Sequence, residues 1–140
     1  MQPFYCNETS AIEMAFIDFL EKQSRIHWWF KNGDRDAVFF AVPYQENGDK
    51  KPFYVDFIVQ RKDGSTGLFD TKSGLTRQVA GTKIDGLNAY IKEHNKKGKN
   101  LFGGIVTNTD ARKFTGRWIC FNKDGKELTT SNDNWENLVF

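Results

Sequence analysis

Two apolar runs joined by a short polar turn constrain the fold of this chain more than any other feature. In chain order, the three pieces read "FYVDFIVQ", "RKDGSTG" and "LFDTKSG". Apolar and β-branched residues on both sides of a glycine-containing turn predict a β-hairpin. Asp56, Asp70 and Lys72 stand inside the two runs, although burying a charged side chain costs several kcal/mol unless it is paired or binds a metal. We therefore interpret this hairpin as the part of the chain that carries its chemistry.

The length of the turn decides whether the two aspartates meet. Because side chains alternate between the faces of a strand, an odd turn of three or five residues brings Asp56 and Asp70 to one face as neighbours. Such a turn places Gly64 or Gly67 in a left-handed bulge position. A two-residue Asp-Gly turn would instead place Asp56 opposite Thr71 and separate the carboxylates. The purely apolar face of the hairpin is expected to lie on the core.

With an odd turn, two carboxylates come within reach of one cation. Carboxylate oxygens with room for water suit Mg²⁺ or Mn²⁺. Lys72, two residues after Asp70 on the same face, can orient or deprotonate an attacking water and stabilise negative charge on a phosphate. The sequence has no Cys-His cluster typical of zinc, no nucleophile elbow and no phosphate-binding glycine loop. Acyl transfer and nucleotide hydrolysis are therefore poorly supported.

Composition indicates one globular domain over residues 1–140. The chain is 39% hydrophobic and 27% charged, with a net charge of +2, values typical of soluble proteins. We find no signal peptide and no apolar run near the roughly 20 residues of a membrane span, so we expect a cytoplasmic protein that does not contact membranes. The basic stretch from Lys72 to Lys99 is compatible with a polyanion-binding side or with a solvated helix end.

Apolar periodicity predicts a mixed α/β domain. A helix is expected over residues 7–23, capped by Asn7 or Thr9, and a second over residues 76–97. The expected strands are 26–31, 37–44 (closed by Pro43), 52–60, 68–73 and 101–108, followed by a last hairpin of residues 117–122 and 127–131.

The hairpin also resembles a known nuclease motif. Val55-Asp56, a turn and Asp70-Thr71-Lys72 are similar to the signature of the PD-(D/E)xK nuclease superfamily. Within residues 8–107, the segments "IEMAFIDFLEKQSRIHWWFKNG", "KIDGLNAYIKE" and "NLFGGIV" flank it in the matching order. Together they resemble the C-terminal endonuclease domain of type III restriction enzymes and related superfamily-two helicases.

This resemblance implies a restriction-endonuclease-like fold: an α-β-β-β-α-β core over about residues 8–107, with a mixed central sheet flanked by helices. Residues 108–140 would add a C-terminal β-hairpin. It further implies DNA cleavage with Mg²⁺, for which Mn²⁺ may substitute, in restriction, defence or DNA processing, with a helicase or translocase as a possible partner. By the same resemblance, the metal-binding acids are Asp56, Asp70 and Glu13, and the catalytic lysine is Lys72.

The chain departs from that pattern at two positions. Val55 replaces the usual proline, and Gly86 stands where some relatives have a glutamine four residues before the tyrosine that corresponds to Tyr90. The substrate contacts are then expected from Lys83, Gln78 and Arg77.

The same residues are compatible with other functions. The acids could be ion-paired in a catalytically inactive nucleic-acid-binding module, and an active nuclease could act on RNA or on branched DNA. Trp28 and Trp29 could stack on unpaired bases, but packing is favoured for them. We also expect Trp118 and Trp135 to pack.

Overall fold

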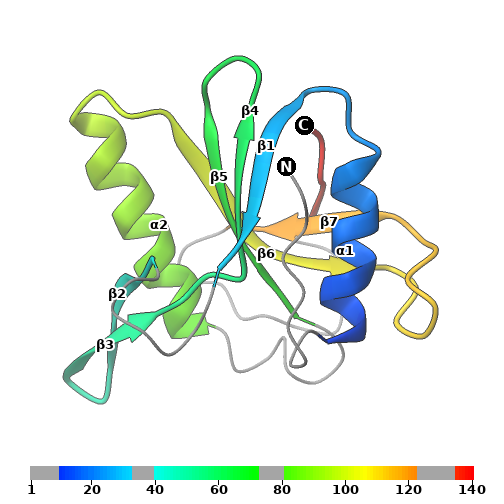
Figure 1. The fold of residues 1–140 in the computed structure, drawn as a ribbon. Helices are drawn as coiled ribbons and strands as arrows, with labels where there is room; N and C mark the ends of the chain where they lie inside the picture. Colours follow the sequence, from blue (N-terminus) through cyan, green and yellow to red (C-terminus); the bar gives the residue numbers. More distant parts are fainter. Residues whose placement is uncertain (1–9, 33–39, 73–80, 123–134) are drawn as a thin grey trace.

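A computed structural model describes residues 10–32, 40–72, 81–122 and 135–140 (Figure 1). Two helices and eight strands are described in it. They are α1 (Ala11–Glu21), β1 (Ile26–Lys31), β2 (Val42–Glu46), β3 (Asp49–Phe53), β4 (Phe57–Arg61), β5 (Thr66–Thr71), α2 (Gly81–Lys96), β6 (Leu101–Asn108), β7 (Trp118–Phe121) and β8 (Glu136–Asn137).

Six strands form one mixed sheet in the order β1-β4-β5-β6-β7-β8. All neighbouring strands in it are antiparallel except β5 and β6, which are parallel. Because α2 lies between β5 and β6 in the chain, it makes the crossover that parallel strands need. Strands β2 and β3 form a separate two-stranded sheet. The mixed α/β class predicted from the sequence is confirmed.

Each face of the large sheet is covered by one helix, and the two helices lie on opposite sides of it (Figure 1). The α1-side core comprises Ile12, Phe16, Ile17, Leu20, Trp29, Phe57, Val59, Phe69, Val106, Trp118 and Phe140. The α2-side core comprises Val42, Tyr44, Phe53, Val55, Leu68, Ile84, Leu87, Ile105, Ile119, Phe121 and Trp135. The apolar side chains of the hairpin at Phe57, Val59 and Phe69 lie on the core as expected. The opposite face of the sheet is buried as well, which is typical of a sheet with a parallel crossover.

The strand expected over residues 52–60 is broken in two. Strand β3 ends at Phe53 and β4 begins at Phe57, so Val55 packs in the α2-side core whereas Phe57 packs in the α1-side core. Asp56 therefore stands immediately before β4 and not in a strand interior. The change of face requires the chain to leave the regular strand between these residues.

The region around Pro43 also differs from the prediction. Pro43 does not close its strand but lies inside β2, opposite Pro52 of β3. Between β2 and β3 stand Asn47 and Gly48, both with positive φ (51° and 83°), as a tight two-residue hairpin turn requires. The polar residues around Asn47-Gly48 also suit a loop, which is why the sequence pattern does not predict this hairpin. Residues 33–39, which include the start of the expected strand, lie outside the described part.

Helix α1 begins later than predicted, and the start of the second predicted helix falls among residues that are not described. The N-cap of α1 is Ser10, whose side chain accepts a hydrogen bond from the Glu13 amide; the predicted caps Asn7 and Thr9 lie outside the described residues. Helix α2 begins at Gly81, and residues 73–80 are likewise not described. Neither described helix is long and apolar enough to cross a membrane.

The C-terminal segment is part of the main sheet. Strand β7 pairs with β6, and β8 pairs with β7, while residues 123–134, including the expected strand 127–131, lie outside the described chain. Trp118 and Trp135 are buried, which confirms that they pack. Trp29 is also buried, and Trp28 is half-buried.

Candidate active site

The β4–β5 hairpin has the odd turn that the sequence argument required. The Arg61 amide donates a hydrogen bond to the Ser65 carbonyl, which leaves three turn residues, and Gly64 among them has φ 93°. Phe57 pairs with Phe69 in this register. Continued by one residue, the same register places Asp56 level with Asp70, so the two aspartates meet as predicted.

Asp56 is fixed from two directions. Its carbonyl accepts a hydrogen bond of 2.8 Å from the Asn32 amide, just past the end of β1. Its carboxylate Oδ2 accepts two hydrogen bonds, from the amide and from the hydroxyl of Thr71, both 2.8 Å. The side chain is half-buried. The break between β3 and β4 thus places the Asp56 carboxylate next to β5, where Thr71 holds it with two hydrogen bonds.

Asp70 is buried, with only 2% of its side chain exposed. Its Oδ2 forms an ion pair with Lys72 Nζ at 3.0 Å, and this buried oxygen accepts no hydrogen bond within the described part of the chain. Burial raises the pKa of Asp70 well above its usual range, the charge of Asp56 raises it further, and Lys72 opposes both. The Asp56 and Asp70 carboxyls are close enough for one to hydrogen-bond to the other.

Lys72 connects this carboxyl pair to solvent. Burial lowers the pKa of its ammonium, but the close ion pair with Asp70 and the charges of Asp56 and Glu13 outweigh burial, so the pKa is raised overall. About a quarter of the side chain, 23%, remains exposed. The cluster is therefore open to solvent on the side of Lys72.

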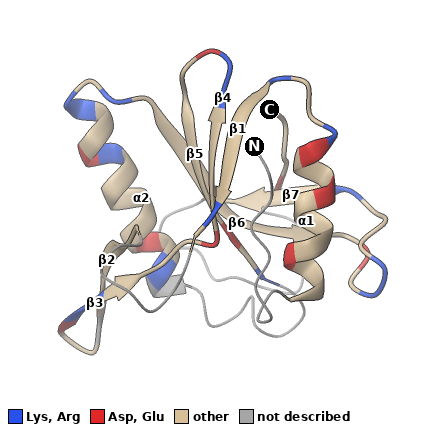
Figure 2. Ribbon diagram, viewed as in Figure 1, with Lys and Arg blue, Asp and Glu red and all other residues tan. Residues whose placement is uncertain are grey.

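Glu13 reaches the same cluster from α1. Its Oε2 lies 2.8 Å from Lys31 Nζ, and its Oε1 accepts a hydrogen bond of 2.8 Å from the Ser10 hydroxyl. The Glu13 amide in turn donates to the Ser10 hydroxyl oxygen, so the N-cap residue of α1 is bonded to both the main chain and the side chain of Glu13. Asp56, Asp70 and Lys72 thus lie together, and Glu13 lies near enough for its charge to help raise the pKa of Lys72. Acidic and basic residues gather where β1, β4 and β5 converge (Figure 2).

Lys31 is the cluster residue that sequence reasoning missed. It is the last residue of β1, paired across the sheet with Phe57, which follows Asp56. A lysine at a strand end is usually solvated, and only the adjacent motif "WWFKNG" marked this one. With 10% of its side chain exposed, Lys31 is largely buried.

The acids of the cluster differ in how well they fit a divalent cation. Within the described ranges, no three His, Cys, Asp or Glu side chains converge as a formed metal site. The Asp56–Asp70 pair nevertheless fits a hard cation, because its donors are carboxylate oxygens and the buried Oδ2 of Asp70 accepts no hydrogen bond from the described residues. Glu13 is instead engaged by Lys31 and Ser10.

Comparison with known proteins places the chain in a family. The sequence model of the YagJ family matches residues 3–115. The chain belongs to the YagJ family. No curated protein and no solved structure matches the chain. The YagJ match runs from α1 to beyond β6, so all five residues of the cluster lie inside it, whereas β7 and β8 lie outside.

Of the three residues predicted to contact substrate in this YagJ-family chain, the structure describes one. Lys83 of α2 places its Nζ 5.4 Å from the centroid of the Phe53 ring, a cation–π arrangement. Gln78 and Arg77 lie outside the described residues. At Gly86, a Cβ atom would stand 2.6 Å from Cβ of Tyr44, so close helix packing explains why no larger side chain stands at this position.

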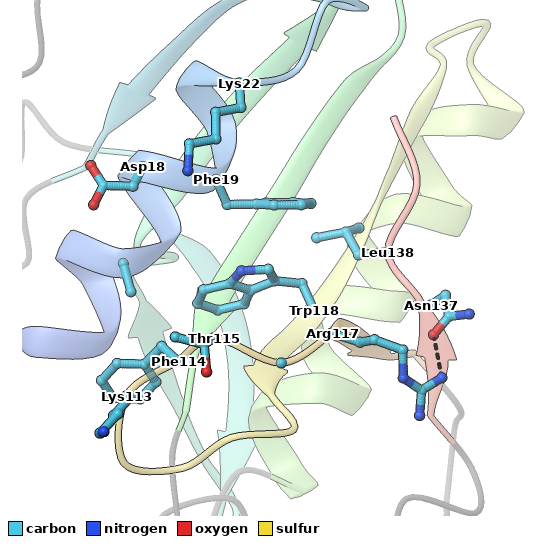
Figure 3. A pocket seen from close by; sticks show the side chains of 12 residues that line it. Asp18, Phe19, Lys22, Lys113, Phe114, Thr115, Arg117, Trp118, Asn137 and Leu138 are labelled. Atoms are coloured by element: carbon cyan, nitrogen blue, oxygen red, sulfur yellow. Dashed lines mark hydrogen bonds between the residues drawn. The ribbon is translucent and has the colours of Figure 1, made fainter.

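A groove lies beside α1, away from the cluster (Figure 3). It has a volume of about 670 Å³, with Phe19, Phe114 and Trp118 around it and Lys22 and Lys113 at its edges. Lys22 follows Glu13 by nine residues, or two and a half helical turns. The two side chains therefore leave α1 on opposite sides, and the groove is no part of the candidate active site.

Proposed function

We propose that this YagJ-family protein is a metal-dependent nuclease that hydrolyses DNA phosphodiester bonds. The observation that carries the proposal is the meeting of Asp56, Asp70 and Lys72 at one solvent-accessible point, with Asp56 held by Thr71. The resemblance to the PD-(D/E)xK motif implies catalytic roles for the same residues. Two adjoining carboxylates beside a lysine are a suitable combination for phosphoryl chemistry.

The fold supports the same proposal. Without the β2–β3 insertion and the C-terminal strands, the element order is α1, β1, β4, β5, α2 and β6. This is the α-β-β-β-α-β order of a restriction-endonuclease-like core, with the acids on β5 and directly before β4. We propose that fold family for the domain, with β7 and β8 as additions to its sheet.

Each residue has a part in the proposed hydrolysis. Asp56 and Asp70 would hold Mg²⁺ or Mn²⁺, which supplies a Lewis acid and an activated water when bound. Thr71 orients Asp56 through two hydrogen bonds. Lys72, with its partly exposed ammonium, is placed to meet the scissile phosphate and stabilise its developing negative charge.

A second candidate function has its own observation. Glu13 pairs with Lys31, and Asp70 pairs with Lys72, so each of these acids has an internal cation. Such pairs are also expected in a nucleic-acid-binding module without activity, associated with a helicase or restriction complex. That alternative predicts salt-dependent binding that does not change when divalent cations are removed.

Cleavage assays separate the two candidates. Single- and double-stranded DNA and RNA are incubated with the protein in Mg²⁺, in Mn²⁺ or with chelator. We expect cleavage only with a divalent cation, and loss of at least about a hundredfold in Asp70→Asn and Lys72→Ala. The control is Asp63→Asn, which changes an exposed acid at the tip of the same hairpin. Undiminished cleavage by Asp70→Asn, or none by the wild type on any substrate, would reject the proposal.

A further inference from the structure

Glu13, the third acid of the cluster, forms an ion pair with Lys31. The two charged atoms are 2.8 Å apart, and the side chains are only 15% and 10% exposed. The other Glu13 oxygen accepts the Ser10 hydroxyl at 2.8 Å. Both oxygens of Glu13 are thus engaged by the protein itself.

Lys31 is held where it can act on the rest of the cluster. It ends β1 opposite Phe57, and the next residue, Asn32, donates its amide to the Asp56 carbonyl. The ammonium is therefore anchored to the same main-chain junction that positions Asp56. A cation so placed competes directly with any other cation for the Glu13 carboxylate, because one oxygen cannot fully satisfy both charges.

We propose that Lys31 is a positioning residue that controls the access of a divalent cation to Glu13. In the metal-free protein, Lys31 neutralises Glu13 and keeps it apart from the Asp56–Asp70 pair. When a divalent cation binds between the aspartates, Glu13 can become a further ligand of the cation only after its ion pair with Lys31 breaks. This inference rests on the proposed function, because it takes the aspartate pair as the cation site.

The inference differs from a purely structural role for the pair. If Lys31 only stabilised the fold, its removal would lower stability and leave cation affinity unchanged. If Lys31 competes for Glu13, its removal makes cation binding tighter, and it does so only while Glu13 is present. The two roles therefore predict different cation affinities for the variant that lacks Lys31.

Binding of Mn²⁺ to the metal-free protein, measured by calorimetry without nucleic acid, is the test. Lys31→Met keeps most of the apolar stem and removes the charge, and we expect it to lower the dissociation constant about fivefold. In a Glu13→Gln background, the same substitution is expected to have no effect, which completes a double-mutant cycle. Lys31→Arg keeps the charge and is expected to bind Mn²⁺ no more tightly than the wild type.

The outcomes distinguish this inference from the proposed function. Wild-type binding that disappears in Asp70→Asn but is unchanged or weaker in Lys31→Met overturns the role of Lys31 alone. Absence of binding in both the wild type and Lys31→Met overturns the cation site and the inference together. If Lys31→Met does not fold, tighter binding by Lys31→Arg is the result that overturns the inference.

Discussion

Thr71 donates two hydrogen bonds to one oxygen of Asp56, from its amide and from its hydroxyl, each 2.8 Å long. The amide bond survives any substitution other than proline, so the hydroxyl can be tested separately. Because Thr71 is buried and the acceptor is a carboxylate, we expect Thr71→Val to lower the free energy of unfolding by about 1.5–2 kcal/mol.

Thr71→Ser is the matched control, since it keeps the hydroxyl and loses only a methyl group, at a cost of about 1 kcal/mol. Urea unfolding in chelator measures both variants. A Thr71→Val protein as stable as the wild type would show that the hydroxyl bond does not hold Asp56.

Asp70 should make the metal-free protein less stable as the pH rises. Its folded-state pKa is raised, chiefly by burial, above an unfolded value of about 3.9. The folded protein therefore keeps the proton longer, and stability is lost from about pH 4 upward until the pH passes the folded pKa. Asp70→Asn lacks this loss, so its free energy of unfolding should rise relative to the wild type as the pH increases above about 4.

The measurement is urea unfolding of both proteins in chelator at several pH values. Lys72 does not disturb the comparison, because its raised pKa keeps it charged in both states over this range. A constant difference between the two proteins would contradict the prediction.

The hairpin and its acids could be predicted because local rules determine them. Alternation along the strands and an odd turn suffice to bring Asp56 and Asp70 together, and the glycine at position 64 is a local signal. Element order also follows from apolar periodicity. These rules apply to residues that are close together in the sequence. They suffice here because most of the site lies within one hairpin.

The remaining features depend on contacts between distant segments. The strand is interrupted between Phe53 and Phe57 because α1 and α2 bury opposite faces of the sheet. The alternation of residues within this segment does not indicate that interruption. Lys31 joins the cluster because β1 pairs with β4.

Asn32 closes the segment that precedes β2, and its loss should be costly. Its side chain donates to the Phe40 carbonyl at 2.6 Å and accepts from the Phe40 amide at 3.1 Å, and the residue is buried. Asn32→Ala leaves the Phe40 carbonyl and amide without their side-chain partner, so we expect the free energy of unfolding to fall by about 2–3 kcal/mol.

Asn95 offers a matched control, because its side chain makes the same pair of bonds to the main chain of Leu101 but is exposed. Water can replace the lost bonds there, and Asn95→Ala is expected to cost less than about 1 kcal/mol. Equal losses in thermal or urea unfolding would show that burial of Asn32 is not what matters.

Gly86 should resist replacement by alanine despite its place in a helix. Alanine is favoured over glycine by about 1 kcal/mol in a helix interior, but here its Cβ would stand 2.6 Å from Cβ of Tyr44 and 2.9 Å from the Pro43 carbonyl. Neither atom lies at the end of a flexible side chain, so α2 must move from β2, and we expect a net loss of about 1–3 kcal/mol.

Ala89→Gly, at an exposed position of the same helix, calibrates the intrinsic preference and is expected to cost about 1 kcal/mol. Urea unfolding of the two variants decides the matter. A Gly86→Ala protein more stable than the wild type would mean that α2 can shift without loss.

Cys120 should be unreactive in the folded protein. It is a free thiol on β7, its sulfur lies against Gly104 of β6, and burial raises its pKa to about 12, with the charge of Glu136 contributing. Because the thiolate is the nucleophile, a thiol-specific reagent at pH 8 should not modify Cys120 on the folded chain. In a Cys6→Ser background, we expect one reactive thiol in urea, almost none under native conditions, and none in either condition once Cys120→Ser is added. Rapid native modification at the rate of an exposed cysteine would show that β7 opens readily from β6.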